Sequence, residues 1–348
     1  MPEQTDIGLN RRHLMGAVAA GAAGMGLAVN AQAQEKAAEL KPLQVIDFHN
    51  HYIGPSFAIT ANASTPAQQL VNSNLANPAA LLGSLELAGV VGRVINTPTA
   101  FLEDADGNVP AGVIPRINDE LAALAAKHPG KIHALASIDA FSGEVGAREL
   151  TRAVKELGLK GVFIESARGE LLLNAPQARP VLAAAAALGV PVFIHPQTDK
   201  QMHARFSKTG SLGMRFARGA INSLALISLL EGGVFDELPK LKVVVTTLAM
   251  GGVMLAGGFG DGYNIRKDAP ELLRRHVYID TMGLNAASVT AAVAMLGADH
   301  VLAGTDWPIV VEKAVPERLQ AAMVAAGLSA RDQELIARGN VLRLLGVG

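Results

Sequence analysis

The chain has 348 residues, half of them hydrophobic, which is enough for the core of one large barrel domain of roughly 250 residues or more. Its 30 basic and 31 acidic side chains nearly cancel, so no overall field draws the protein to nucleic acid or to an anionic membrane surface, and a small-molecule substrate is the expected partner. Because the chain has no cysteine, disulfides, thiolate nucleophiles and cysteine-bound zinc are excluded, and any metal needs histidine and carboxylate ligands.

The first 33 residues are typical of an export signal. The pair Arg11-Arg12 precedes an Ala/Gly-rich apolar stretch at 14–29, and residues 31–33 (AQA) have the spacing that a signal peptidase recognises. The stretch is shorter than the roughly 20 apolar residues of a membrane span, so we expect no stable anchor. The arginine pair resembles a twin-arginine signal, although no Ser or Thr precedes it; an ordinary secretory signal is the alternative. We expect export to the periplasm or beyond, with 34–348 as a single domain.

From residue 43 onward, short Val/Ile-rich runs alternate with Ala/Leu-rich helical stretches. This alternation indicates repeated βα units, and the runs are nearly continuous in apolar residues, as buried parallel strands are. Eight strands separated by helices predict an α/β fold of the closed (β/α)8 TIM-barrel type. The expected strands are 43–49, 90–96, 131–138, 160–165, 190–195, 241–248, 276–281 and 300–305, and the helical candidates include 79–88, 117–127 and 143–157.

Two stretches interrupt the regular spacing, 50–78 after the first strand and 196–219 after the fifth. In a barrel, such connections lie at the carboxyl ends of the strands and build the active site, so we expect long loops that cover a substrate. The Gly-rich stretch 251–262 lacks the lysine and serine of a phosphate-binding loop and is interpreted as a loop that helps to close the barrel.

Polar side chains stand where several of the predicted strands end. His49 and His51 end the first strand, and alternation turns both into the barrel mouth and Asn50 away from it. Two histidines at this spacing, taken alone, are at least as often a chance arrangement as a metal site. Here, however, His195 ends the fifth strand and Asp306 follows the eighth. Imidazole and carboxylate are ligands that Zn²⁺ accepts, and also Mn²⁺ or Fe²⁺. The four residues therefore predict a divalent metal site, with Zn²⁺ favoured and Mn²⁺ as the alternative.

Five motifs give the chain a resemblance to the amidohydrolase superfamily, in the branch of aminocarboxymuconate semialdehyde decarboxylase and γ-resorcylate decarboxylase. They are IDFHNHYIGP, GVPVFIHP, LPKLKVVV, GTDWP and the terminal GNVLRLLG, and the resemblance covers nearly all of 34–348. It implies that His49, His51, His195 and Asp306 are metal ligands, that Asp306 also acts in catalysis by hydrogen-bonding a metal-bound water, and that the protein forms a homodimer.

One position departs from that family pattern. The sixth strand usually ends in histidine, whereas Thr247 stands there in this chain, and a hydroxyl cannot exchange protons near neutral pH as an imidazole does. Glu165, at the end of the fourth strand, is the first candidate to replace it, unless it only pairs with Arg168. His203, after the fifth strand, is the second candidate, unless it is simply solvated. Trp307 is predicted to stack on the substrate at the pocket rim; plain packing is its alternative.

Three functions remain open from the sequence. The leading hypothesis is a metal-dependent decarboxylase of a small aromatic or unsaturated carboxylic acid, with a Lys or Arg from the long loops holding the acid. The alternative is a metal-dependent hydrolase of a lactone, ester or amide, which needs the same ligands. The third is an inactive or ligand-binding barrel, which the replacement of histidine by Thr247 motivates.

Overall fold

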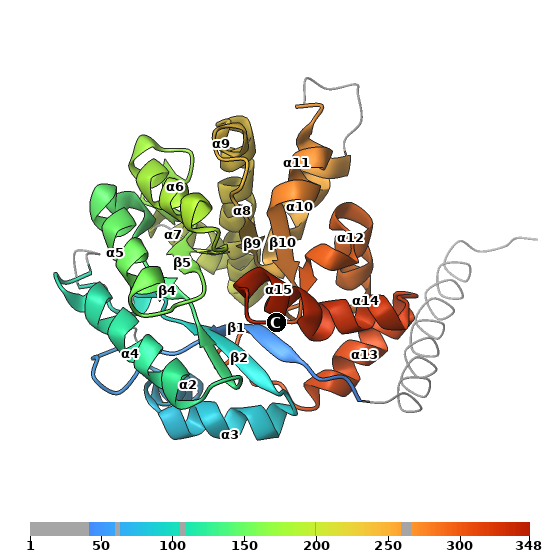
Figure 1. The fold of residues 1–348 in the computed structure, drawn as a ribbon, viewed down its shortest axis with the longest axis horizontal. Coiled ribbons are helices and arrows are strands. Elements are labelled where there is room, and N and C mark those ends of the chain that lie inside the picture. Colours follow the sequence, from blue (N-terminus) through green and yellow to red (C-terminus); the bar gives the residue numbers. More distant parts are fainter. Residues whose placement is uncertain (1–41, 60–62, 105–108, 199, 259–265) are drawn as a thin grey trace, which may run out of the picture.

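The computed structural model describes residues 42–59, 63–104, 109–198, 200–258 and 266–348. Parallel strands stand at the centre of the molecule, and helices surround them (Figure 1). The central strands are β1 (Ile46–His51), β2 (Gly92–Asn96), β3 (Ile132–Ala134), β4 (Ala136–Ser137), β5 (Val162–Glu165), β8 (Val192–His195), β9 (Val243–Val245), β10 (Val277–Asp280) and β11 (Val301–Leu302). A short antiparallel hairpin, β6 (Ala167–Arg168) and β7 (Leu171–Leu172), follows β5.

The strands close into a barrel through two seams. At the first, β3 and β4 form one strand interrupted at Leu135, whose N–H donates to Ile95 O of β2 at 3.0 Å while β4 pairs with β5. At the second, Phe48 N donates to Ala303 O at 2.8 Å, and Asn50 forms a parallel bridge with Trp307. With β3 and β4 counted together, eight strands surround one interior, which confirms the predicted (β/α)8 barrel.

The helices follow the strands and cover the outside of the barrel. The three helices predicted from the sequence correspond to α3, α4 and α5, with boundaries that differ by a few residues. The helices are α2 (Pro66–Ala76), α3 (Pro78–Ala88), α4 (Val113–Lys127), α5 (Glu144–Lys155), α6 (Arg179–Leu188), α7 (Lys200–Phe206), α8 (Gly210–Glu231), α9 (Val234–Glu237), α10 (Met250–Gly258), α11 (Ala269–His276), α12 (Ala286–Leu296), α13 (Val315–Ala325), α14 (Ala330–Glu334) and α15 (Asn340–Leu345).

The barrel interior is filled by side chains and closed at one end by the last helix. Each strand contributes a buried residue to this inner core, and α15 packs Val341, Leu344 and Leu345 against it. Figure 1 shows α15 in front of the strands, at the end where they begin. A ligand can therefore reach the barrel only at the opposite, carboxyl end of the strands.

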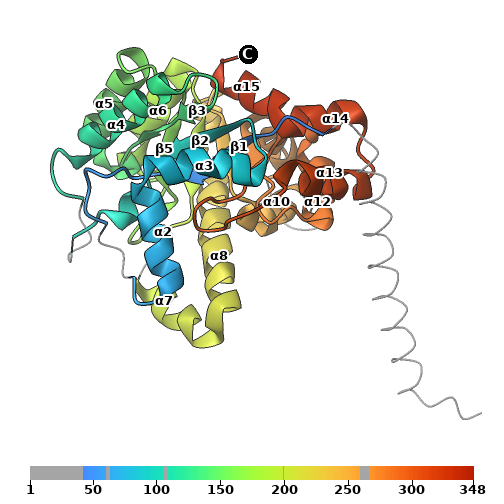
Figure 2. The same ribbon diagram turned by 90° about the horizontal axis from the view of Figure 1, so that it is seen from below.

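Two segments predicted as loops contain helices. The first includes α2, which starts with a capping box formed by Thr65 and Gln68, and the second consists largely of α7 and the first half of α8. Figure 2 shows α2, α7 and α8 projecting together from one side of the barrel. The Gly-rich stretch was also interpreted wrongly, because 250–258 form α10, in which Gly252 packs closely on Ser223 of α8. Tertiary packing outweighs the low helix propensity of glycine here.

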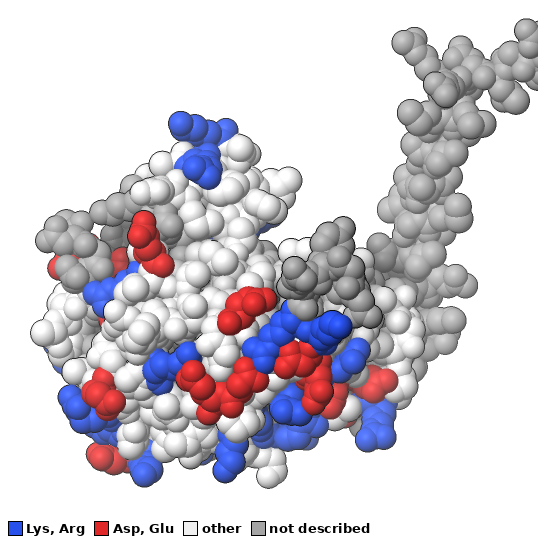
Figure 3. Space-filling model, turned by 90° about the horizontal axis from the view of Figure 1, so that it is seen from above, with Lys and Arg blue, Asp and Glu red and all other residues white. Residues whose placement is uncertain are grey.

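The predicted export signal lies outside the described residues. Within the described part of the chain, no helix combines the length and apolar character that a membrane span requires. Acidic and basic side chains are interspersed over the body of the face drawn in Figure 3, in keeping with the nearly balanced total charge. That face therefore carries no large field of one sign over the body of the protein.

Candidate metal centre

A β-bulge in β1 turns both histidines of the first strand into the barrel mouth. The pairing of β1 with β2 shifts between Asp47 and Asn50, so Phe48 and His49 together occupy the space of one residue. Phe48 belongs to the inner core with Ile46, while His49 and His51, both 1% exposed, face the site. Ile46 and His49 are three residues apart, so strict alternation would place them on opposite faces of the strand. The extra residue in the bulge brings both to the inner face.

The Nδ1 atom of each of three histidines has a polar partner outside the cluster. His49 Nδ1 lies 2.6 Å from Asp280 Oδ2, His51 Nδ1 lies 2.8 Å from Asn96 Oδ1, and His195 Nδ1 lies 2.9 Å from Glu165 Oε2. An Nδ1–H that donates to oxygen leaves the lone pair on Nε2, which is the usual arrangement of a metal-binding imidazole. The three rings thus present Nε2 to one shared position.

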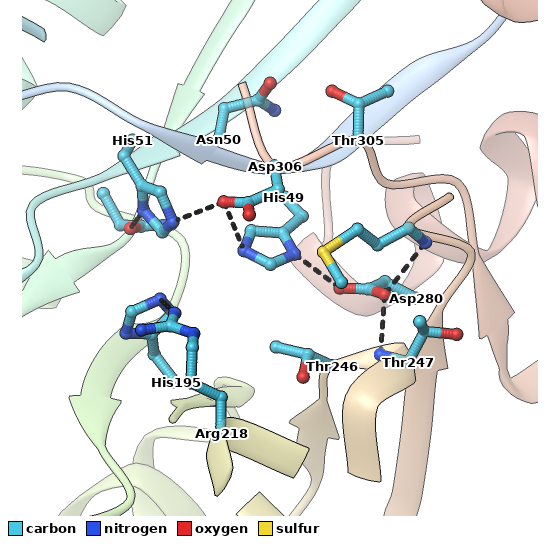
Figure 4. Close-up of polar contacts among 12 residues, drawn as sticks. His49, Asn50, His51, His195, Arg218, Thr246, Thr247, Asp280, Thr305 and Asp306 are labelled. Carbon is cyan, nitrogen blue, oxygen red and sulfur yellow. Dashed lines mark hydrogen bonds and ion pairs between the residues drawn. The ribbon is translucent and has the colours of Figure 1, made fainter. Parts of the chain in front are cut away.

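Unpaired buried atoms mark that position. His49 Nε2 and His51 Nε2 lie 3.4 Å and 3.1 Å from Asp306 Oδ1, and none of these three buried atoms has a hydrogen-bond partner among the described residues. One ligand atom from each of His49, His51 and His195 lies within 4.8 Å of the other two, so the trio could hold a metal ion (Figure 4). Buried polar atoms without partners are costly, and a divalent cation would satisfy all of them at once.

Electrostatics at the cluster favour a bound cation. Burial lowers the pKa of His51 and of His195, and Arg218 lowers that of His195 further, so both rings are neutral near pH 7. Burial alone would lower the pKa of His49, but Asp306 and Asp280 outweigh it and raise that pKa. Burial alone would raise the pKa of Asp306, but His49, His51 and Arg218 bring it below its ordinary value. Two neutral imidazoles beside an ionised carboxylate suit a metal ion, and a bound cation would displace the proton that the two aspartates favour on His49.

Asp280 lies at the site, although it was not among the residues predicted from the sequence. It ends β10, holds His49 through Oδ2, and accepts hydrogen bonds from Thr247 N and Met282 N through Oδ1. A Cβ at Gly304 would lie 2.9 Å from the Asp280 Cβ and 3.0 Å from the His49 Cβ, so glycine in the GTDWP motif permits this close approach. The rule applied to Glu165 and His195, a polar residue at the end of an apolar strand, would have found Asp280 too.

Glu165 lies between the histidine cluster and a cavity. It bonds to His195 rather than to Arg168, which pairs with Asp139 at 2.5 Å. Burial raises the pKa of Glu165 to about 8, although Arg218 opposes that shift. The cavity has a volume of about 1100 Å³ and is lined by the segments that follow β2, β4, β5 and β8, including Ile138 and Phe141. The cavity thus lies at the carboxyl ends of the strands, and Glu165 connects it to the cluster, although its lining includes neither the three histidines nor Asp306.

The structure places the other candidate residues away from the cluster. The backbone N–H of Thr247 donates a hydrogen bond to Asp280, and Figure 4 shows the Thr247 hydroxyl turned away from the three histidines. His203 is an exposed residue of α7. Trp307 is 3% exposed and packs with Arg93, whose guanidinium carbon lies 5.4 Å from the ring centre. This packing is the alternative considered for Trp307, and its contact with a substrate stays a prediction.

Comparison with known proteins gives the family. A family model described as Amidohydrolase matches residues 46–347. The chain belongs to this family. The amidohydrolase is 27% identical over 288 residues to 2-amino-3-carboxymuconate-6-semialdehyde decarboxylase of Dictyostelium discoideum, an alignment that covers 80% of this chain and 79% of the relative. It is also 27% identical over 222 residues to γ-resorcylate decarboxylase of a Polaromonas species, covering 56% and 65% of the two chains.

Solved structures share the fold of this amidohydrolase. A 2,6-dihydroxybenzoate decarboxylase complexed with 2,6-dihydroxybenzoate has a TM-score of 0.73 at 19% identity, covering 87% of this chain and 99% of its own. The 5-carboxyvanillate decarboxylase of Novosphingobium aromaticivorans, complexed with manganese and 4-hydroxy-3-methoxy-5-nitrobenzoic acid, has a TM-score of 0.74 at 19% identity, covering 87% and 96%. The predicted family, branch and barrel are thereby confirmed.

Proposed function

We propose that the protein is a metal-dependent decarboxylase of a small aromatic or unsaturated carboxylic acid. The observation that carries the proposal is the cluster of His49, His51 and His195 at the barrel mouth, with Asp306 Oδ1 3.4 Å and 3.1 Å from the first two. Beside it, Glu165 contacts His195 and lines a cavity of about 1100 Å³. The names of the relatives support the reaction class, since those proteins are described as decarboxylases of such acids.

His49, His51, His195 and Asp306 would hold the metal, which we propose to be Zn²⁺, with Mn²⁺ as the alternative because a similar structure contains manganese. A divalent cation supplies a Lewis acid that stabilises the electrons left behind when CO2 departs. The carbon that loses CO2 then needs a proton. Three carboxyl groups of the described residues lie beside the cluster, those of Asp306, Glu165 and Asp280. Asp280 is already engaged by His49 and by two backbone N–H groups, so we assign proton delivery to Asp306 and Glu165.

Metal analysis and CO2 release test this function together. We expect about one equivalent of Zn or Mn per chain in the purified protein, and CO2 release from at least one hydroxybenzoic or unsaturated acid by protein reloaded with either metal. Chelator-treated protein is the matched control and should be inactive. A fully loaded protein that releases no CO2 from these acids but cleaves a lactone or ester would replace the proposal by the hydrolase alternative.

The side chain at position 247 tests whether the site lacks an acid/base group. We expect Thr247→His to change turnover by less than about twofold, because the position faces away from the cluster, and Glu165→Gln to lower it by about 10–100-fold, as for other partners of metal-binding histidines. Thr290→His, at an exposed position of α12, is the control. A manyfold gain in Thr247→His alone would show that a missing base limits this protein.

We also propose that the protein is exported with removal of its first 33 residues, on the evidence of the N-terminal sequence alone. Mass spectrometry of the protein from the periplasmic fraction is expected to show a chain that begins at Gln34. Replacing Arg11 and Arg12 by lysine should retain the precursor inside the cell if the twin-arginine route is used. Export that survives this change indicates an ordinary secretory signal, and a full-length mature chain contradicts the cleavage.

A further inference from the structure

A cationic side chain outside the predicted ligand set reaches the metal centre. Arg218, on α8, places Nη2 3.0 Å from His195 Nε2, the atom that faces the metal position (Figure 4). It comes from the second segment predicted to be a long loop, from which a Lys or Arg was expected to hold the acid, although the sequence did not indicate which residue.

The backbone of Arg218 is held firmly beside the site. Its neighbour Gly219 lies so close to η5 (Thr247–Ala249) that a Cβ there would be 2.7 Å from Leu248 O. One turn further along α8, Asn222 donates to Ile194 O at 3.0 Å and accepts from Thr246 N at 3.1 Å, which ties the helix to the ends of β8 and β9. The guanidinium therefore extends from a fixed point over the barrel mouth.

The charge of Arg218 is not neutralised by a direct partner. Among the described residues, none of the ion pairs within 4.0 Å includes Arg218. Arg218 lowers the pKa of Glu165 and of Asp306 by electrostatic attraction from beyond ion-pair distance. A guanidinium has five N–H donors, and the one described contact occupies a single one of them. A metal ion on His195 Nε2 would displace this contact and repel the guanidinium, and an anion bound between the two cations would offset that repulsion.

We propose that Arg218 is the anion-binding group of this centre and holds the carboxylate of the substrate beside the metal position. The inference rests on the proposed metal-dependent reaction and adds the residue that selects an ionised acid. The planar guanidinium can bind a carboxylate through two parallel hydrogen bonds, which fixes its orientation as well as its position. A neutral ester or lactone offers no such anion, so Arg218 favours acids over the substrates of a hydrolase.

Ligand binding to metal-loaded protein tests the role of Arg218 independently of turnover. Salicylate and its neutral amide, salicylamide, serve as probes in calorimetric titrations, with metal content measured on the same samples. We expect Arg218→Gln to weaken salicylate binding by about 10–100-fold and to change salicylamide binding by less than about twofold. Arg218→Lys should fall between, since it keeps the charge and loses the two-bond geometry. Arg215→Gln, one turn away and exposed, is the matched control.

The outcomes separate this inference from the proposed reaction. Equal salicylate affinity in wild type and Arg218→Gln at equal metal content overturns the role of Arg218, even when CO2 release is observed. Failure of the loaded wild type to distinguish salicylate from salicylamide overturns it as well. Selective loss of salicylate binding in Arg218→Gln supports the role of Arg218, even when none of the acids tested is decarboxylated and the reaction class has to be revised.

Discussion

A His51→Ala variant is expected to lose its divalent metal and at least about a hundredfold of its activity. Loss of an outer partner of a metal-binding histidine costs about 10–100-fold, and removal of the ligand itself costs at least as much. His51 Nε2 is buried and lies 3.1 Å from Asp306 Oδ1, and the Nδ1 atom of the ring contacts Asn96, so the substitution removes a ligand atom that the fold holds in place. Elemental analysis after gel filtration and the rate of CO2 release measure the two effects.

His128→Ala is the matched control. His128 caps the end of α4, away from the cluster, so this substitution removes an imidazole ring from a position outside the site. Far-UV circular dichroism of both variants establishes that they fold. Full metal content in folded His51→Ala would contradict the assignment of His51 as a ligand. Full metal content with lost activity would instead make His51 a residue that acts on the substrate.

An Arg93→Ala variant is expected to lose about 3–5 kcal/mol of the free energy of unfolding, the usual consequence of removing one member of a buried ion pair. Arg93 is 1% exposed and bonds to Asp47 and Asn50 through Nη1, and its Nη2 donates to Ser84 O of α3 at 3.2 Å. Without it, the fully buried Asp47 must bind a proton or stay uncompensated. Denaturant unfolding of the metal-free protein measures the loss.

Arg116→Ala is the control for Arg93. Arg116 also lies over an aromatic ring, with its guanidinium carbon 5.0 Å from the centre of Phe57, but it is exposed, so its removal should cost no more than about 1 kcal/mol. Equal destabilisation by the two substitutions would show that the Arg93–Asp47 pair adds nothing beyond an exposed contact.

The Arg93 network also supports the metal centre from outside the barrel. Asp47 accepts from Thr305 Oγ1 at 2.6 Å and from Thr305 N at 3.0 Å, and Thr305 precedes Asp306. Asp306 has a backbone φ of 72°, a left-handed conformation that is uncommon for residues other than glycine, and its N–H donates to His49 O at 2.9 Å. The buried ion pair thus helps to hold Asp306, the proposed fourth ligand, beside His49 and His51.

The barrel and the metal-ligand candidates were predictable because their signals are local. Apolar runs of strand length alternate with helical stretches, and a parallel strand that ends in a polar residue places it at the carboxyl end of the barrel whatever the rest of the chain does. His49, His51, His195 and Asp306 satisfy that rule, and the structure brings the four together. The rule also covers Glu165 and Asp280, of which only Glu165 was selected.

The remaining features depend on contacts between distant segments, so the sequence by itself could not supply them. The bulge in β1 exists because its pairing with β2 shifts after Asp47, and the pattern of one strand does not contain that register. The helices α7 and α8 form where glycines and scattered charges indicate a loop, because Asn222 and Gly219 fix α8 against β8, β9 and η5. The sequence thus determined the barrel and the candidate metal ligands at its mouth, while tertiary packing alone brought Arg218 to His195 and turned Thr247 away from it.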